Sequence, residues 1–298
     1  MSLFDELVDE ALNNKQELAP LRVVVEKELL HRDILRVLSG AGLLTRLTFI
    51  GGTCLRACYG SSRLSEDLDF TGGADFTRDQ LAAMSNILIE SLKAKYGLEI
   101  NVTDPVREEG NVATWKLKVQ TRAGRKDIPA QRINIDVCAI PSYQPRPMAL
   151  FNPYGVEMGT SGLILQAQSR EEIFADKLVA FALRPNRLKN RDLWDIAWLH
   201  QQQIKPALNL IKYKLNDHHA ETGAYLSAFA VRSASLNKDA EIAKEFRKEM
   251  ARFLPNETVT ETVTSEKFWE YLSNLIEGYH QQLTQTLVGQ ENSPEFKM

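Results

Sequence analysis

The stretch that decides the fold is LTFIGGTCLRACYGSSRLSEDLDF, residues 47–70. Its first four residues predict a short buried strand that runs into Gly51-Gly52-Thr53. Residues 55–59 then predict a short helix, which ends at Gly60. Residues 66–70 predict a second strand, in which acidic and apolar side chains alternate between its two faces. This order of elements is the strongest feature of the chain.

Two carboxylates and two glycines in this stretch indicate a site for a metal-bound phosphate. Asp67 and Asp69 are two residues apart on a predicted strand, so both side chains project from one face and can hold one hard cation. Gly51 and Gly52 let backbone amides approach a phosphate, and Thr53 places a hydroxyl where a helix start favours an anion, so a triphosphate fits. Either half alone is more typical of a glycine turn or a solvated acidic strand. The spacing of 14 residues from Thr53 to Asp67 favours the joint site.

A third carboxylate, Asp136, lies in the predicted strand 133–137. The odd-numbered residues of this strand are apolar, so Asp136 shares the other face with Asn134. Next to Asp67 and Asp69, Asp136 would complete the ligands of a two-metal site, in which one ion activates the attacking oxygen and the other holds the triphosphate. The alternative is an exposed strand residue.

Lys177 lies inside an apolar stripe, because its neighbours at minus four, minus three, plus three and plus four are all apolar. Either its stem packs on the core while the ammonium reaches solvent, or the ammonium is held beside an anion. Asp192 and Asp195 follow one turn apart on the next predicted helix, and Asp192 could orient Lys177 or contact a nucleotide. The alternative for Asp192 is helix capping and pairing with Arg191.

The composition is that of an ordinary globular protein of 298 residues, with 44% hydrophobic and 25% charged residues. No apolar run approaches the roughly 20 residues of a membrane-spanning helix, and the acidic N-terminus does not resemble a secretory signal. Three cysteines without a C-x-x-C pair exclude a disulfide framework. We therefore expect a cytoplasmic protein that has no contact with a membrane.

The chain divides into a mixed-sheet part and a helical part. Period-two patterns predict strands at 98–102 and 113–119, and four prolines between 141 and 153 predict an irregular connection before a last strand near 163–167. We expect a helix over 78–96, N-terminal helices before residue 45, and only helices beyond residue 171. The expected domains are 1–165, which holds the N-terminal helices and the sheet, and 166–298, which carries Lys177 and Asp192.

Two basic clusters interrupt a chain whose formal net charge is only −3. They are local candidates for contacts with nucleic acid, although a solvated surface is the more common meaning of such clusters. Their members are Lys116, Lys118, Arg122, Arg125 and Lys126 in the first, and Arg184, Arg187, Lys189 and Arg191 in the second.

Four motifs in this order resemble the AbiEii/AbiGii family of nucleotidyltransferase-like toxins over about residues 24–200. They are Gly51-Gly52-Thr53, Asp67-x-Asp69, Glu172 to Lys177 with Ala180, and Arg191-Asp192-x-x-Asp195-x-x-x-Leu199, with Val25-Glu26-Lys27 in the leading helix. The chain departs from the family pattern at Thr53, where serine is frequent, but the hydroxyl is kept.

The resemblance implies an α+β fold, with a polymerase-beta-like nucleotidyltransferase core followed by a helical domain. It also implies use of Mg²⁺ and an NTP, and toxin action beside a DNA-binding antitoxin in a type IV toxin–antitoxin pair. By position it gives Thr53, Asp67, Asp69, Lys177 and Asp192 as active-site residues; Asp136 rests mainly on the physical argument.

Three hypotheses for the function follow. The first is transfer of a nucleotide from an NTP to RNA, with the tRNA 3′ end as the favoured acceptor, since some relatives modify it. The second keeps the chemistry but transfers the nucleotide to a protein hydroxyl. The third is a nucleotide-binding module that acts by sequestering a partner.

Overall fold

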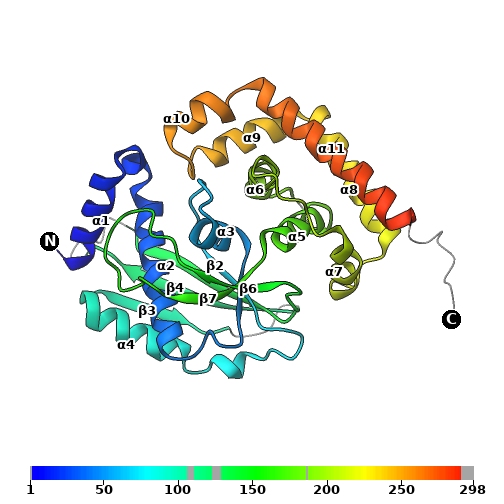
Figure 1. Cartoon of the computed structure of the whole chain (residues 1–298). Helices are drawn as coiled ribbons and strands as arrows, with labels where there is room; N and C mark the ends of the chain where they lie inside the picture. The colour runs from blue at the N-terminus through cyan, green and yellow to red at the C-terminus, as the bar shows by residue number, and fades with distance from the viewer. Residues whose placement is uncertain (1, 106–110, 123–128, 186, 290–298) are drawn as a thin grey trace. The chain divides into compact units, whose positions relative to one another are not determined.

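The computed structural model describes residues 2–105, 111–122, 129–185 and 187–289. The chain forms two compact units, Met1–Ser169 and Arg170–Met298. Figure 1 shows a mixed α/β ribbon for the first unit and helices for the second. These elements confirm the predicted α+β class, a mixed sheet with helices followed by a helical C-terminal region.

The first unit contains one seven-stranded mixed sheet in the order β3-β4-β5-β2-β1-β7-β6. The central strand β2 pairs in parallel with β5 and antiparallel with β1. The strands are β1 (Thr48–Ile50), β2 (Leu68–Thr71), β3 (Glu99–Thr103), β4 (Val112–Gln120), β5 (Gln131–Cys138), β6 (Pro145–Ala149) and β7 (Ile164–Gln168).

One face of this sheet is apolar and covered by helices. On β5, Ile133, Ile135 and Val137 are buried and alternate with polar residues, as the period-two pattern predicts. α2 contacts β5 and α4 contacts β3, and these two helices lie along the same sheet in Figure 1. The helical segments of this unit are α1 (Leu3–Asn14), a 3₁₀ turn (Gln16–Leu21), α2 (Arg22–Gly40), α3 (Gly51–Tyr59), a second 3₁₀ turn (Arg78–Leu81) and α4 (Met84–Tyr96).

The structure differs from the sequence expectations at three boundaries. α3 begins at Gly51, so the two glycines form the first turn of the helix instead of preceding it. The helix expected over 78–96 is a 3₁₀ turn followed by α4, and β2 begins only at Leu68, so Asp67 precedes the strand.

A short strand, β6, interrupts the irregular connection expected from the prolines, which otherwise has no regular secondary structure over residues 139–144 and 150–163. Pro145 and Pro147 lie on the outermost strand of the sheet, opposite Gln168 and Gln166 of β7. Proline lacks the N–H that a central strand must donate, but an edge strand tolerates its absence.

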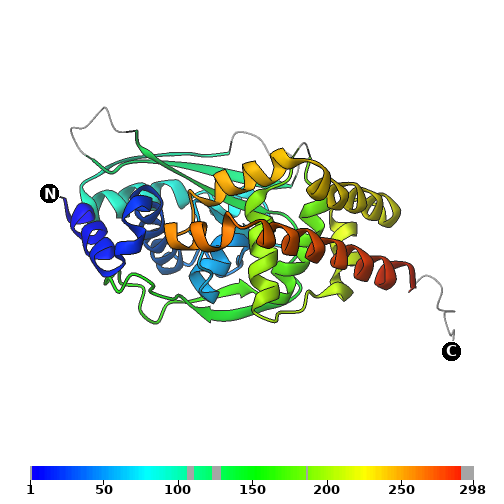
Figure 2. The ribbon, with the colours of Figure 1, turned by 90° about the horizontal axis from the view of Figure 1, so that it is seen from above.

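The second unit is helical. Its core is rich in aromatic contacts, among them Phe174 with Tyr279 and Phe181 with Phe229. None of the helices described is both long enough and apolar enough to span a membrane. The segments are α5 (Arg170–Leu183), α6 (Asn190–Gln201), a 3₁₀ turn (Leu208–Leu210), α7 (Ile211–Asp217), α8 (Thr222–Lys238), α9 (Ala240–Met250), α10 (Asn256–Thr258), a π-helical turn (Val259–Val263) and α11 (Glu266–Gly289). Figure 2 shows the ribbon from above.

Candidate active site

The glycine-initiated helix α3 begins directly against the carboxylate of Asp69. β1 pairs antiparallel with β2 so that Ile50, the last residue before the helix, is opposite Asp69. Gly51 then has a φ of +75°, which residues with a Cβ rarely adopt, and a Cβ there would lie 3.0 Å from Oδ2 of Asp69. Position 51 therefore requires glycine twice over, for its backbone conformation and for its approach to Asp69.

Asp69 and Asp136 occupy paired positions on the adjacent parallel strands β2 and β5. Neighbouring strands are about 4.8 Å apart, so the two carboxylates leave the polar face of the sheet side by side. On the far side of Asp136, Thr114 of β4 occupies the next paired position and donates a 2.6 Å hydrogen bond to Oδ1. Like charges at paired positions are unfavourable in a sheet, so the arrangement is one that a cation would stabilise.

Asp67 lies just before β2 and is held at both its side chain and its backbone. Oδ1 accepts a 2.9 Å hydrogen bond from the backbone N–H of Asn134, which ties Asp67 to β5. Its carbonyl oxygen accepts a hydrogen bond from Oγ1 of Thr53. The carboxylate is half-buried, and within the described parts of the chain its Oδ2 has no hydrogen-bond or ion-pair partner.

Thr53 differs from the phosphate-facing hydroxyl that the sequence suggested. The side chain is only 3% exposed, and its Oγ1 lies 2.5 Å from Oγ of Ser65 in addition to its bond to Asp67. The hydroxyl therefore fixes the loop before β2. The N-terminal amides of α3 remain the groups suited to an anion, because the first N–H groups of a helix have no partner within the helix.

The donor chemistry fits a divalent cation that also contacts a substrate. Among the described residues, no three Asp, Glu, His or Cys side chains lie close enough together to hold a metal ion by themselves. Mg²⁺ is usually bound by one or two carboxylates and completes its shell with waters and substrate phosphates. Asp69 and Asp136 supply such a pair of oxygen donors, and Asp67, two residues before Asp69, is bonded to the backbone N–H of Asn134, two residues before Asp136.

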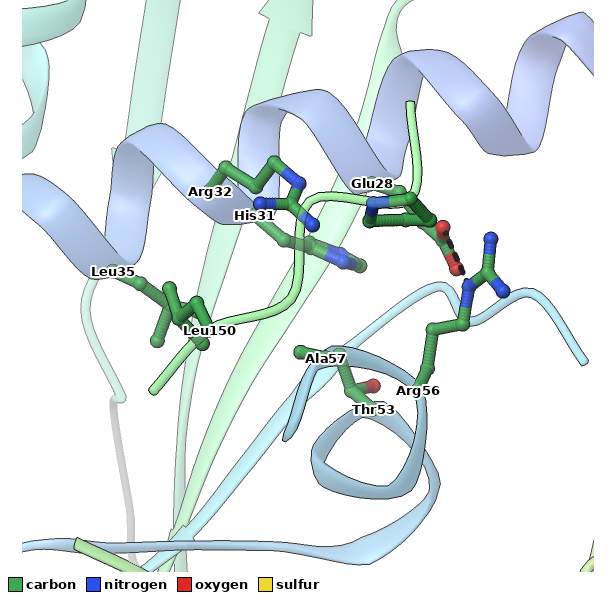
Figure 3. Close-up of a pocket in the computed structure, with 9 residues that line it drawn as sticks. Glu28, His31, Arg32, Leu35, Thr53, Arg56, Ala57 and Leu150 are labelled. Atoms are coloured by element: carbon green, nitrogen blue, oxygen red, sulfur yellow. Dashed lines mark hydrogen bonds and ion pairs between the residues drawn. The ribbon is translucent and has the colours of Figure 1, made fainter. Parts of the chain in front are cut away.

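A buried polar network joins α2 and α3, and Figure 3 shows its members Glu28 and Arg56. Glu28 of α2 is 5% exposed, and its Oε2 accepts hydrogen bonds from Nε of Arg56, at 3.1 Å, and from the hydroxyl of Tyr154. Burial and the adjacent Glu28 charge raise the pKa of Tyr154 well above its usual value, so the phenol keeps its proton. Glu28 and His31 are not recognisable as site residues from the sequence, where their signal is a polar residue inside the apolar stripe of a helix.

In the second unit, the ammonium of Lys177 lies between two carboxylates of α6. Nζ is 2.5 Å from Oδ1 of Asp192 and 2.9 Å from Oδ2 of Asp195. The Lys177 side chain is 10% exposed, and those of Asp192 and Asp195 are 5% and 0% exposed. Of the two sequence alternatives, the geometry therefore matches an ammonium held beside an anion.

Asp192 remains ionised although it is buried. Burial raises its pKa, but the positive charges of Lys177, Lys189 and Arg184 lower it more, and the net result lies well below the usual range. Arg184 contributes directly, with Nη2 at 3.3 Å from the second oxygen, Oδ2.

The first basic cluster divides into two parts. Lys116 and Lys118 of β4 are exposed on the same face of the sheet as Asp136, and Lys118 is paired with the exposed Arg132 of β5. None of these three cations forms a hydrogen bond or ion pair with another residue that the structure describes. Arg122 instead pairs with the buried Glu26 at 3.0 Å. Arg125 and Lys126 lie outside the described residues.

Most of the second basic cluster takes part in internal pairs. Arg184 contacts Asp192, and Arg191 pairs with Glu249 at 3.2 Å and lies over the ring of Phe253. Lys189 also has an interaction within the chain, whereas Arg187 is exposed. These residues are therefore mainly structural.

Comparisons with known proteins identify a family and a similar fold. A family model described as nucleotidyl transferase AbiEii toxin, type IV TA system, matches residues 33–274. The fold is similar to the crystal structure of JHP933 from Helicobacter pylori, at 20% identity and a TM-score of 0.50, over 90% of this chain and 96% of that one. A candidate nucleotidyltransferase from H. pylori matches at 19% identity and a TM-score of 0.48, over 96% of this chain and 99% of that one. No curated protein matches significantly.

Proposed function

Because that family model spans residues 33–274, the chain belongs to the AbiEii family of nucleotidyl transferase toxins, and we propose that it transfers a nucleotide from an NTP to RNA. The proposed acceptor is the 3′ end of tRNA, whose modification would block translation. The oxygen of the acceptor hydroxyl attacks the α-phosphorus of the NTP, the bond to the β-phosphate breaks, and pyrophosphate leaves as the hydroxyl proton is lost.

The observation that carries this proposal is the side-by-side placement of Asp69 and Asp136 beside the N-terminus of α3. A bare pair of carboxylates repels a triphosphate, whereas a pair that holds Mg²⁺ binds one. When bound, the cation would supply charge stabilisation of the triphosphate and activation of the attacking oxygen. We propose Asp69 and Asp136 as its first ligands and Asp67 as a third, which would complete the set only once the cation is bound, because the three carboxylates are not gathered around one point in the chain alone.

The residues of this chain have separate tasks in the proposed reaction. Gly51 and Gly52 begin a helix whose free amides bind a phosphate oxygen, because no side chain at position 51 blocks the approach. Thr53 acts indirectly, by holding the backbone of Asp67. Thr114 orients Asp136 through its hydrogen bond to Oδ1.

Lys177 and Asp192 are proposed as further active-site residues on the strength of their place in the family motifs. The contacts of Lys177 support a role as a fixed positive charge, because two carboxylates hold its ammonium in one position. Asp192 would then act mainly by orienting Lys177, since it is buried and bonded to it.

An RNA acceptor is favoured over a protein acceptor by the cations on the polar face of the sheet. Lys118 and Arg132 face each other across β4 and β5, and Lys116 is beside Asn134, one strand repeat from Asp136. Like charges at paired positions are unfavourable, and phosphates between them would remove the penalty. A phosphate backbone along these residues would bring the end of a strand toward Asp136.

The proposed setting follows from the family and the substrates. Membership in a type IV toxin–antitoxin family implies an antitoxin partner. We propose that this antitoxin binds DNA and that the toxin acts in the cytoplasm, where NTPs and tRNA are found.

The test is incubation of the purified protein with each of the four labelled NTPs, Mg²⁺, and either tRNA, total RNA or total protein. We expect label on tRNA. The Asp69→Asn variant should fold normally and transfer at least about 100-fold more slowly, because a charge that stabilises the reacting phosphate is lost. Normal transfer by Asp69→Asn would show that the metal assignment is wrong.

The choice of acceptor is tested by charge reversal. Lys118→Glu and Arg132→Glu should weaken RNA binding at every sequence without changing NTP binding, since these contacts position the backbone. Lys93→Glu is the matched control, because Lys93 is exposed on α4, the helix that covers the opposite face. Label on protein would favour the protein-hydroxyl alternative, and NTP binding without transfer would favour a module that sequesters a partner.

A further inference from the structure

The loop that leads into Asp67 is fixed by side chains from two helices. Residues 61–67 connect α3 to β2 without regular secondary structure, yet Ser61, Leu64 and Ser65 are buried. The first carboxylate of the proposed site therefore depends on a segment that lies outside the sheet ladder. Whatever holds this segment also sets the position of Asp67.

Each of three consecutive loop residues, 65–67, makes one backbone hydrogen bond with a side chain of α2 or α3. The N–H of Ser65 donates to Oε1 of Glu28 at 2.9 Å. Nε2 of His31 lies 2.9 Å from the carbonyl oxygen of Glu66, and Oγ1 of Thr53 donates to the carbonyl oxygen of Asp67. Glu28 and His31 are three residues apart, so they lie on the same face of α2.

Other contacts in turn fix the side chains of Glu28 and His31. Glu28 is held by Arg56 and Tyr154, and Figure 3 shows Glu28, His31 and Thr53 around one small cavity between α2 and α3. A carbonyl oxygen only accepts hydrogen bonds, so Nε2 of His31 must carry a proton. His31 is 3% exposed, and its ring is a neutral, fixed donor because burial lowers its pKa.

We propose that Glu28 and His31 are positioning residues for Asp67, which set its carboxylate for a divalent cation. The proposal rests on the function proposed above, in which Asp67 is one of the cation's ligands. Neither residue touches the substrate; each acts through the backbone of residues 65–67. His31 is the residue to vary, because it carries no charge, whereas removal of Glu28 would leave the guanidinium of Arg56 buried without its partner.

The experiment compares three variants. His31→Leu removes the donor but keeps an apolar side chain, and His31→Gln keeps an N–H donor near the position of ring Nε2. Tyr96→Phe is the matched control, because Tyr96 is a buried residue like His31 and donates a hydrogen bond to Asp33 of α2, on a contact that does not involve residues 61–67. Mn²⁺ binding is measured by titration calorimetry without nucleotide, and amide exchange is followed in residues 62–68.

We expect His31→Leu to bind Mn²⁺ about tenfold more weakly, a loss of about 1.4 kcal/mol, and to exchange faster over residues 62–68. Its transfer activity should recover in part at raised Mg²⁺ concentration. His31→Gln should stay within about threefold of the wild type, and Tyr96→Phe should lower thermal stability only. Unchanged Mn²⁺ affinity in His31→Leu, or no Mn²⁺ binding by the wild type, would overturn the proposal.

Failure of the proposed function gives a different pattern. If the wild type binds Mn²⁺ and His31→Leu weakens that binding, while no NTP is consumed with any acceptor, the positioning role stands and nucleotide transfer is wrong. The opposite pattern is also distinguishable. If the wild type transfers nucleotide, and His31→Leu lowers the transfer rate no more than Tyr96→Phe does at the same loss of stability, then nucleotide transfer stands and the positioning role is wrong.

Discussion

The two acidic groups of this protein are built in opposite ways. On the sheet, Asp67 accepts a hydrogen bond from the backbone N–H of Asn134, and Asp136 accepts one from the hydroxyl of Thr114. In the helical unit, two buried carboxylates share the ammonium of Lys177.

The difference concerns where the balancing positive charge comes from. The helical group carries its cation within the chain, so it is stable without any ligand. On the sheet, Asp67 is oriented by a neutral donor and pairs with no cation among the residues that the structure describes, which is the state expected of a ligand for an external cation. The helical group therefore stabilises the fold in addition to its proposed role in the active site, whereas the sheet group serves mainly to bind.

The largest expected effect is from Lys177→Met, which tests whether the helical group is balanced internally. The change keeps the apolar length but leaves Asp192 and Asp195 buried without their cation, so we expect a loss of about 3–5 kcal/mol in the free energy of unfolding. Urea denaturation followed by tryptophan fluorescence measures it, because three of the four tryptophans lie in the second unit.

Two further variants make this comparison specific. Lys244→Met removes an ammonium from an exposed pair with Glu241 and should cost less than about 0.5 kcal/mol. Adding Asp192→Asn and Asp195→Asn to Lys177→Met should recover much of the lost stability, because no buried charge then lacks a partner. Wild-type stability in Lys177→Met would mean that the ammonium is hydrated and the group is not internally balanced.

The second-largest expected effect is a loss of activity in Gly51→Ala, which tests the sheet site. A Cβ at this position would lie 3.0 Å from Oδ2 of Asp69 and must displace it, so we expect nucleotide transfer to fall about tenfold and stability to fall by about 1–2 kcal/mol. Initial rates of transfer and thermal unfolding of the same sample separate the two effects.

Gly42→Ala is the control for backbone strain. Gly42 has a similar φ of +73°, but a Cβ there would meet nothing within 4 Å. The two variants should lose similar stability, and only Gly51→Ala should lose activity. Equal rates of nucleotide transfer in the two variants would show that the start of α3 has no part in the reaction.

The smallest expected effect is a pH dependence of stability that comes from the helical group. The folded-state pKa of Asp192 is lowered, so its contribution is complete above an unfolded-state pKa of about 3.9 and is lost as the pH falls below it. Each pH unit below that value should remove at most about 1.4 kcal/mol from the wild type.

Asp192→Asn lacks this titration, so the difference in unfolding free energy between it and the wild type should shrink between pH 5 and pH 3. Glu241→Gln, on an exposed pair of the same unit, serves as the reference. A constant difference across this range would mean that Asp192 titrates normally in the folded protein.

Alternation along single strands was readable from the sequence, whereas pairing between strands was not. The period-two pattern placed Asp136 opposite the apolar face of its strand, and the structure agrees. The register that pairs Asp136 with Asp69 joins strands 67 residues apart, and no local pattern encodes such a pairing.

The same limit applies to contacts between side chains and the backbone. Thr53 was recognised as a hydroxyl at a helix start, but its actual partner, the carbonyl of Asp67, is defined only once the loop is folded. Likewise, the apolar neighbours of Lys177 predicted an unusual environment, whereas its contact with Asp195 as well as Asp192 depends on how α5 packs on α6.

The prolines of β6 have a consequence for the behaviour of the protein in crowded solution. Pro145 and Pro147 are two residues apart, so both missing N–H groups fall on the same side of the strand. That side faces away from β7, because the even-numbered residues Gln144 and Leu150 make the backbone hydrogen bonds to the segment that holds β7, and β6 has no strand on its other side in the sheet that the structure describes. The free edge of β6 therefore offers backbone C=O acceptors to a strand of another molecule but lacks two of the N–H donors. This edge resists the intermolecular strand pairing that leads to aggregation.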